Sequence, residues 1–236
     1  MKITSLLVSF GVALSICTSA GAATIDIDSR IGLGLTPDNQ GFPAFFANGF
    51  VQGATSHTNT IAFDDGVVEV EFTLTVEAFA AGGAPAGLFV NNQASGIDGG
   101  ANNTEIDAGE QLKVTYDNIA FSVIGAPPSG LVVDLSSFQA LIGSARLAAF
   151  TPGTDTFTYA GVGAGSVTGD DTQTIEFVPN ASIGVGDMST ITGDGGSFRA
   201  LYVSLHGSYE TVIPEPATLG LLVISIVGIA ASRRMR

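Results

Sequence analysis

The chain has 236 residues, of which 45% are hydrophobic, and its formal net charge is −14 at pH 7. Tryptophan is absent, and Cys17 is the one cysteine. A strongly acidic surface repels phosphate backbones, so the composition argues against nucleic-acid binding.

The first 22 residues have the pattern of a secretory signal peptide. Lys2 precedes an apolar run from Ile3 to Ile16, and Ala20-Gly21-Ala22 forms an A-x-A site for signal peptidase. Cleavage is predicted after Ala22, with Ala23 as the alternative. Cys17 would leave with the signal peptide, because Ile16 stands where a lipoprotein signal needs a small residue. The mature protein then has no thiol, which excludes disulfides, Cys–metal sites and Cys nucleophiles.

Residues 23–211 are expected to form the exported domain. Of the eight basic residues only four lie there, whereas 21 of the 22 acidic residues do, so this part carries a net charge of −17. A domain with such an acidic surface is expected to stay soluble and to attract divalent cations. The length fits one β-rich domain or two small ones.

Alternating apolar residues predict many short strands. The clearest run is Val68 to Ala78, in which every second residue is apolar and would face the core. Further strands are predicted at 25–28, 30–35, 112–116, 119–123, 131–135, 156–160, 174–178, 198–205 and 209–212. Asp117-Asn118 indicates a turn between two of them.

One stretch departs from this alternation. Phe138, Leu141, Ile142 and Ala145 have i, i+3, i+4, i+7 spacing, which predicts a short helix with Ser136 or Ser137 as its N-cap. The expected fold class is therefore all-β: an antiparallel β-sandwich, jelly-roll-like, with at most one short helix.

An acidic, glycine-rich loop is the candidate metal site. Hard oxygen ligands on a flexible loop suit Ca²⁺, which takes six to eight oxygens. The candidate ligands are Asp98, Glu105, Asp107 and Glu110, with Asn102 and Asn103 nearby. Their spacing does not match an EF-hand, so the alternative is a solvated turn, and no other cofactor is predicted.

Catalytic motifs are lacking. A Ser-His-Asp triad could use only His57 or His206, and no Gly-x-Ser-x-Gly elbow is present. His57 is expected in a polar loop and His206 at a strand end. Paired carboxylates could support a hydrolase, but the sequence nominates no pair. The sequence therefore predicts a protein that is not an enzyme.

An aromatic patch is the main candidate for sugar binding. Phe42, Phe45, Phe46 and Phe50 could form an exposed platform for sugar rings, although burial in the core is the preferred interpretation.

The last 25 residues combine three parts. Pro214-Glu215-Pro216 is expected to be stiff and extended, because each proline fixes φ and restricts the residue before it. Ala217 to Ser232 is uncharged, and as a helix it would cover roughly 24 Å, somewhat less than a hydrocarbon core of about 30 Å. Arg233, Arg234 and Arg236 follow and would stay on the cytoplasmic side. A plain membrane anchor is one interpretation of this tail.

The three parts in this order resemble the PEP-CTERM sorting signal of Gram-negative bacteria. The resemblance covers 213–236 and implies processing by an exosortase, passage through the inner membrane, and delivery to the cell surface or an exopolysaccharide matrix. The segment 87–125 is more loosely similar to a stretch of PEP-CTERM ectodomains and implies no activity.

The sequence thus predicts a signal peptide at 1–22, an acidic β-sandwich at 23–211 and a sorting signal at 212–236 with a transmembrane segment at 217–232. The preferred function is that of an exported, non-enzymatic surface or matrix protein. The alternatives are a carbohydrate-binding module, with calcium assisting, and a carboxylate-dependent hydrolase.

Overall fold

The computed structural model describes residues 23–36, 43–98, 104–128, 130–163, 165–169 and 174–213. The predicted signal peptide, Pro214-Glu215-Pro216, the apolar segment 217–232 and the three C-terminal arginines lie outside these residues. Over the described ranges the chain is all-β and contains no helix. Consequently, no helix able to cross a membrane is found in that part of the chain.

Thirteen strands are present in the described ranges. They are β1 (Ala23–Gly32), β2 (Ser56–Asp64), β3 (Val68–Phe79), β4 (Gly87–Val90), β5 (Ser95–Asp98), β6 (Ile106–Asp107), β7 (Gln111–Val123), β8 (Val132–Ala148), β9 (Thr156–Gly161), β10 (Gly165–Gly169), β11 (Thr174–Ser182), β12 (Met188–Gly195) and β13 (Ser197–Val212). The predicted strand at 25–28 and the first part of the one predicted at 30–35 lie in β1, which ends at Gly32. The predicted strands at 198–205 and 209–212 fuse into β13.

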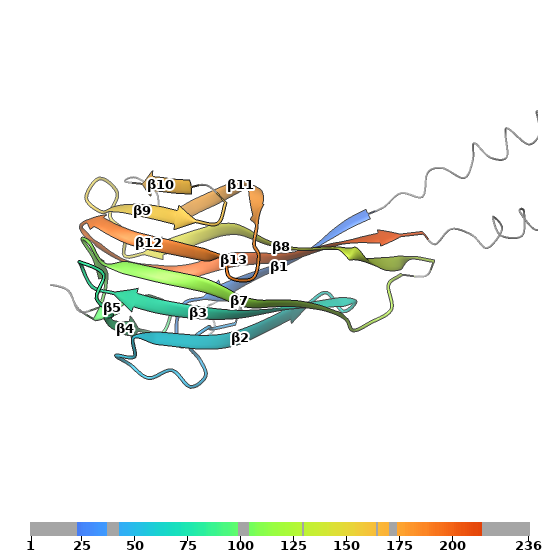
Figure 1. Ribbon diagram of the computed structural model, residues 1–236, viewed down its shortest axis with the longest axis horizontal. Helices are drawn as coiled ribbons and strands as arrows, with labels where there is room; N and C mark the ends of the chain where they lie inside the picture. Colours follow the sequence, from blue (N-terminus) through green and yellow to red (C-terminus); the bar gives the residue numbers. More distant parts are fainter. Residues whose placement is uncertain are drawn as a thin grey trace, which may run out of the picture. The chain divides into compact units, whose positions relative to one another are not determined.

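These strands form two sheets. One has the order β10-β9-β12-β7-β3-β2, and Figure 1 shows β9, β12, β7, β3 and β2 side by side. The other has the order β11-β8-β13-β5-β4, with β1 and β6 also pairing with β13. The β2–β3, β3–β7, β7–β12, β9–β12 and β4–β5 ladders are antiparallel. The predicted all-β class with antiparallel sheets is therefore confirmed.

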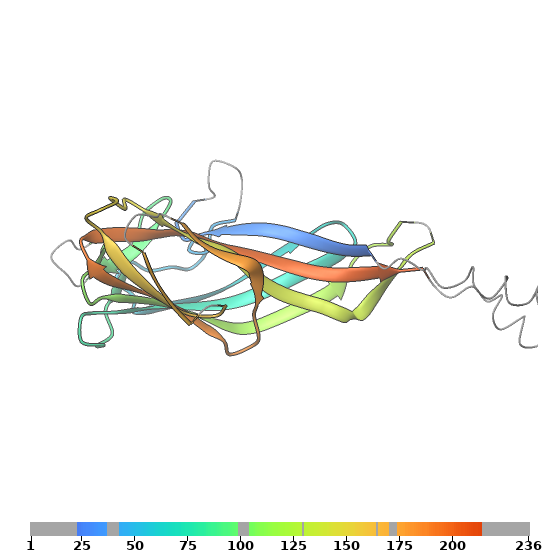
Figure 2. The same ribbon diagram turned by 90° about the horizontal axis from the view of Figure 1, so that it is seen from above.

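Alternation in β3 explains how the sheets share a core. Every second side chain from Val68 to Ala78 is buried, while the residues between them are half-buried on the opposite face. Such a strand presents one apolar face, which must be covered by another layer. In Figure 2, β1 and β13 lie in a layer apart from β3 and β7. One apolar cluster joins the layers, since it contains Phe72 of β3 and Phe198 of β13.

The described chain divides into two compact units. The larger consists of Asp26–Gly125 and Phe138–Ser208, and it contains all the sites considered below. The smaller includes Ala126–Ser137 and the chain from Tyr209 onward. Within the smaller unit, the Glu210 N–H donates to Ser137 Oγ at 2.7 Å.

The turn predicted at Asp117-Asn118 is wrong, because β7 continues through both residues. Opposite them, Thr73 pairs with Asn118 and Leu74 pairs with Tyr116, so Asp117 is the extra residue of a β-bulge. Its carboxylate accepts a hydrogen bond of 2.5 Å from the Thr75 hydroxyl on β3. The polar residue is thus accommodated by the neighbouring strand and does not end β7.

The short helix predicted around Phe138–Ala145 is also wrong, since these residues lie in β8. Ala140 and Ile142 are buried, and the buried positions then resume at Ala145 and Leu147. The alternation therefore changes phase near Gly143. A phase change in a strand produces an apparent i, i+3 spacing, which is what the sequence pattern contained.

Candidate functional site

The four acidic residues predicted as calcium ligands have different surroundings. Asp98 ends β5 and is exposed, while Glu105 forms a bridge opposite Ile97 and lies 3.5 Å from the Arg199 guanidinium. Asp107 ends β6, and Glu110 is buried just before β7. Asn102 and Asn103 lie outside the described residues. Among the residues that the structure does describe, no three His, Cys, Asp or Glu side chains are grouped so as to hold a metal ion.

Glu110 serves the turn between β6 and β7. It is 2% exposed, and its Oε2 accepts a hydrogen bond of 2.9 Å from the Asp107 N–H. Burial raises the pKa of Glu110, the backbone hydrogen bond opposes this, and the nearby Asp107 charge adds to it. A carboxylate engaged in this way closes the turn by binding a backbone donor.

Asp155 is the second buried carboxylate of the described chain, at 4% exposure. Its Oδ2 accepts the Thr151 N–H at 2.6 Å and its Oδ1 accepts the Ser197 N–H at 3.2 Å. Both oxygens therefore bind backbone donors from two segments. Like Glu110, this residue has a structural task.

His57 lies in β2 and not in a loop as predicted. Its ring stacks on Phe46 at 5.3 Å between centroids and meets Phe45 and Phe50 edge-on at 5.4 and 5.5 Å. Its Nε2 is buried without a hydrogen-bond partner in the described chain. Burial lowers the pKa of His57, and a hydrogen bond to the Phe45 backbone partly offsets this effect.

This environment predicts a pH-dependent stability. The folded state favours neutral His57. The stability that this preference contributes is therefore fully present above the unfolded-state pKa of about 6.5, and it is lost as the pH falls through the lower folded-state pKa. We expect the melting temperature to fall more between about pH 7.5 and about pH 5 in the native protein than in His57→Phe. Parallel pH profiles for the two proteins, measured by differential scanning calorimetry, would contradict this expectation.

His206 lies within β13 and not at its end. Its Nε2 is 3.3 Å from Ser204 Oγ, two residues earlier on the same face of the strand. The ring stands over Gly143 of β8, where an added Cβ would overlap Nε2. The glycine therefore makes room for the imidazole.

The preferred interpretation of the aromatic patch is confirmed for Phe45 and Phe46, which are 0% and 1% exposed. Phe50 is partly buried against the same cluster, at 4.9 Å from the Phe46 ring. Phe42 lies outside the described residues. The two buried rings cannot serve as a stacking platform for sugars.

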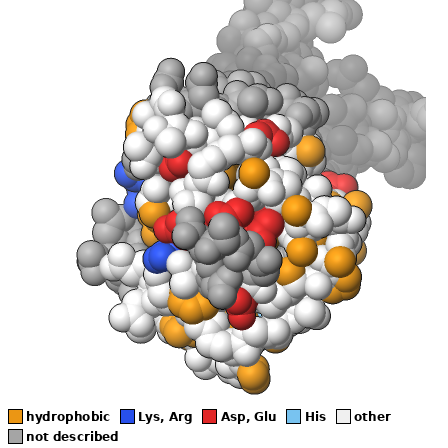
Figure 3. Space-filling model, turned by 90° about the vertical axis from the view of Figure 1, so that its left-hand side faces the viewer, with side chains coloured by type: hydrophobic (Ala, Val, Ile, Leu, Met, Phe, Trp, Pro, Cys, Tyr) orange, Lys and Arg blue, Asp and Glu red, His pale blue; other side chains and the backbone are white. Residues whose placement is uncertain are grey.

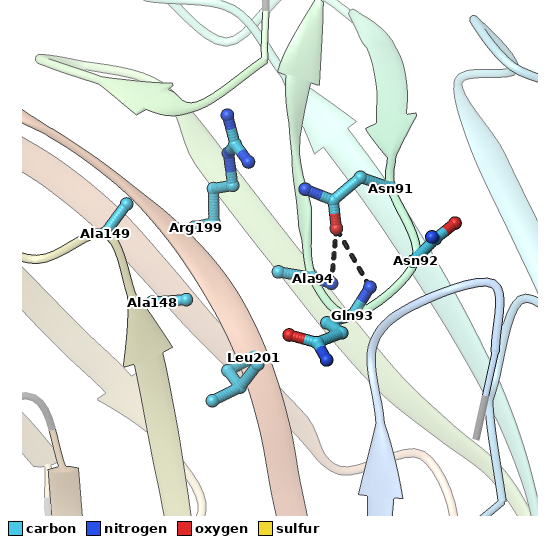
Figure 4. Close-up of a pocket in the computed structure, with 8 residues that line it drawn as sticks. All are labelled: Asn91, Asn92, Gln93, Ala94, Ala148, Ala149, Arg199 and Leu201. Carbon is cyan, nitrogen blue, oxygen red and sulfur yellow. Dashed lines mark hydrogen bonds between the residues drawn. The ribbon is translucent and has the colours of Figure 1, made fainter. Parts of the chain in front are cut away.

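A pocket of about 560 Å³ lies beside β13. Its lining residues are Asn91, Asn92, Gln93, Ala94, Ala148, Ala149, Arg199 and Leu201, shown in Figure 4. The first four form the β4–β5 turn, Ala148 is the last residue of β8 and Ala149 follows it, and Arg199 and Leu201 belong to β13. Its volume falls in the range of about 300–1,000 Å³ typical of small-molecule sites.

Hydrogen bonds from backbone N–H groups hold the turn that forms one wall. Asn91 Oδ1 accepts the N–H groups of Gln93 and Ala94 at 2.9 and 2.8 Å, drawn as dashed lines in Figure 4. Behind the turn, the Leu35 N–H donates to the Asn91 carbonyl at 2.9 Å. Gly34 allows this close approach, because a Cβ there would lie 2.6 Å from Gln93 backbone atoms. The wall is therefore built of fixed backbone.

Arg199 supplies the positive charge of the pocket. Its Nη2 donates to Thr104 Oγ1 at 3.0 Å and lies 3.5 Å from Glu105 Oε1. The face of the molecule in Figure 3 shows many acidic side chains and few basic ones. An arginine in the pocket is therefore a local exception to the acidic surface.

Sequence reasoning did not identify this pocket. The available signals were Asn91-Asn92-Gln93 after the apolar run 88–90, and an arginine between Phe198 and Ala200. The first indicates a turn and the second an outward-facing strand position. That the two lie together follows only from the placement of the β4–β5 hairpin beside β13, through the pairing of Ala200 with Ser95.

Comparison with known proteins gave no match among family models, curated proteins or solved structures.

Proposed function

We propose that this chain is an exported, non-enzymatic protein of the cell surface or extracellular matrix, sorted by its PEP-CTERM-like segment. The observation that carries the proposal is the order Pro214-Glu215-Pro216, uncharged 217–232, then Arg233, Arg234 and Arg236. An exosortase and signal peptidase would be its processing partners. An inner-membrane intermediate would precede release to the surface, and within the sorted protein the described sheets would adopt a jelly-roll-like sandwich.

The surroundings of Glu110, Asp155 and His57 support a non-enzymatic role. Glu110 and Asp155 bind backbone N–H groups, and His57 is packed among phenylalanine rings. Groups held in this way stabilise local structure. They offer no reactive atom to a substrate.

The sorting proposal predicts a processing defect. Replacing Pro214, Glu215 and Pro216 together by alanine is expected to leave the protein uncleaved at its C-terminal side and retained in the inner membrane, because the stiff extended segment presented to the protease is lost. Cell fractionation with intact-mass analysis measures both effects. Thr218→Ala, two residues beyond the triplet, is the matched control and should be processed normally.

Two outcomes of this experiment are informative about the proposal. A smaller, surface-located native protein beside a full-length, membrane-bound variant would support sorting. Identical mature mass and location for the native protein and the triple variant would reduce the triplet to a linker, and the plain anchor would then be the better interpretation.

A second candidate function is extracellular carbohydrate binding. The observation that favours it is the pocket beside β13, where amide side chains and Arg199 surround a cavity of sugar-like size. Titration of the full-length protein with a panel of neutral and acidic saccharides tests it. Absence of binding to all of them would remove this candidate.

A further inference from the structure

We propose that the pocket lined by Asn91, Gln93, Arg199 and Leu201 binds a sugar of the uronic acid class through its single carboxylate group. The proposal deepens the second candidate function and rests on it. Arg199 and Asn91 would hold the carboxylate, and the apolar side of the pocket would contact the sugar ring.

The first argument is the unused hydrogen-bonding capacity of Arg199. A guanidinium has five N–H donors in a planar fork that matches a carboxylate. Here Nη2 contacts Thr104 and Glu105, while Nε is buried without a partner in the described chain. The donors open to a ligand are those on the exposed part of this side chain, which lines the pocket.

Glu105 does not saturate the arginine. Its Oε1 is 3.5 Å from Nη2, whereas a charge-assisted hydrogen bond has a length of about 2.7–2.9 Å. The Arg199 side chain also keeps 25% of its surface exposed. Glu105 and Thr104 therefore fix one edge of the guanidinium and leave donors for a second acid.

The second argument is the orientation of the Asn91 amide. Because Oδ1 accepts two backbone N–H groups, the amide cannot be flipped without losing both hydrogen bonds. Its Nδ2 therefore presents donors, and Figure 4 shows this nitrogen directed to the Arg199 side of the pocket. Two adjacent donor groups, one of them charged, select an acceptor-rich anion.

The third argument is the apolar side of the pocket. Leu201 and Ala148 line it opposite the turn, and the Gln93 amide extends toward Leu201 in Figure 4. A sugar ring has C–H faces that pack on such side chains and hydroxyl groups that a primary amide can bind. A bare inorganic anion would leave this side unused.

The overall charge limits the ligand to one carboxylate at a time. Residues 23–211 carry four basic and 21 acidic residues, so a polyanion would be repelled along most of the surface. A single acidic sugar, within an otherwise neutral glycan or as a monomer, meets the arginine without that repulsion. The ligand class is therefore a monocarboxylated sugar.

The test uses an isosteric pair of variants of the full-length protein. Asn91→Asp keeps the Oδ1 acceptor that closes the turn but replaces the Nδ2 donor with a negatively charged oxygen. Asn180→Asp makes the same charge change at an exposed position of β11, outside the residues that line the pocket. Comparing the two separates the site from the general effect of added charge.

Isothermal titration calorimetry with glucuronate, methyl glucoside and acetate is the measurement. We expect glucuronate to bind at least about tenfold more tightly than methyl glucoside, a difference of about 1.4 kcal/mol. Asn91→Asp and Arg199→Gln should each weaken glucuronate binding at least about tenfold, and Asn180→Asp should change it less than about twofold. Melting temperatures of the variants, compared with that of the native protein, establish that each is folded.

The remaining outcomes contradict specific parts of the proposal. Equal binding of glucuronate and methyl glucoside, unaffected by Asn91→Asp, would overturn the carboxylate site while leaving carbohydrate binding standing. Acetate binding as tight as glucuronate would overturn the sugar class. Failure of every saccharide to bind the native protein would overturn both this inference and the second candidate function.

Discussion

Phe157→Ala is expected to lower the free energy of unfolding by about 3–5 kcal/mol, the range measured for large aromatic residues removed from cores. Phe157 is fully buried, with its ring centroid 5.8 Å from that of Phe150 and 6.0 Å from that of Phe198. Phe157 belongs to β9 of one sheet and Phe198 to β13 of the other. The substitution therefore opens a cavity where the two sheets meet.

Urea denaturation followed by circular dichroism measures this loss. Since domains are stable by only about 5–15 kcal/mol, the variant should unfold at much lower denaturant concentration or fail to accumulate. Phe157→Leu retains most of the volume and should cost less than the alanine change. Val185→Ala, at a position 63% exposed, is the control and should be nearly neutral. A loss below about 1 kcal/mol for Phe157→Ala would contradict the packing described.

Strand alternation predicted the parts of the fold where a strand keeps one phase. Val68–Phe79 and Thr156–Gly161 were found within one residue of the predicted limits. In each, the side chains facing the core follow strict period two. Such regularity depends only on local geometry, so the sequence alone is sufficient.

The turn wrongly predicted at Asp117-Asn118 and the helix wrongly predicted around Phe138–Ala145 share one physical cause. In β7 the bulge at Asp117, and in β8 the change near Gly143, shift the alternation by one residue. In the sequence, a one-residue shift in the alternation of apolar residues has the same pattern as a turn or as one face of a helix. The structure that forms depends on the neighbouring strand, which is β3 for the bulge. The sequence of the segment itself does not identify that neighbour.

The end of β12 has a turn-like composition from Gly193 to Gly196, because glycine and aspartate favour turns. The strand nevertheless continues to Gly195, and Gly193 is there because another segment of backbone crosses it closely. Close approach of backbones is a long-range property, and a turn-like composition does not distinguish it from a true turn.

The candidate site was the least predictable feature. The residues considered for chemistry were acids, histidines and a phenylalanine patch, whereas the pocket is lined by Asn91 and Arg199, each of an ordinary kind in its own segment. Neither residue indicates a pocket by itself, because the pocket forms only where their two segments lie together in the fold. Conversely, Glu110 attracted attention as a possible calcium ligand because it is acidic, yet its carboxylate binds a backbone donor of its own turn.

Gly193→Ala is expected to cost about 3 kcal/mol, because it forces the backbone of the β6–β7 turn out of place. A Cβ at this position would overlap the Asp107 carbonyl oxygen and lie 2.8 Å from its carbonyl carbon. Backbone atoms cannot rotate away as a side chain would. The turn is also tied to Gly193, whose N–H donates to the Glu110 carbonyl at 3.0 Å and whose carbonyl accepts the Gly109 N–H at 2.7 Å.

Gly195→Ala is the matched control on the same strand. The nearest atom to a Cβ there is Thr156 Oγ1 at 2.9 Å, the end of a side chain that can change rotamer. We expect this variant to lose less than about 1 kcal/mol, so that urea denaturation should separate the two glycines clearly. Similar losses in both variants would show that the crossing of Asp107 over β12 is not the cause.

A double variant connects this crossing to the buried carboxylate. Glu110→Ala alone should destabilise the protein by about 1–3 kcal/mol, since it leaves the Asp107 N–H without its acceptor. If Gly193→Ala has already displaced the turn, Glu110→Ala removes little further stability. The free energy of unfolding lost in the double variant should therefore be smaller than the sum of the losses in the two single variants. Strict additivity would mean that Gly193 and Glu110 stabilise separate structures, and the turn would then not be the unit that both of them hold.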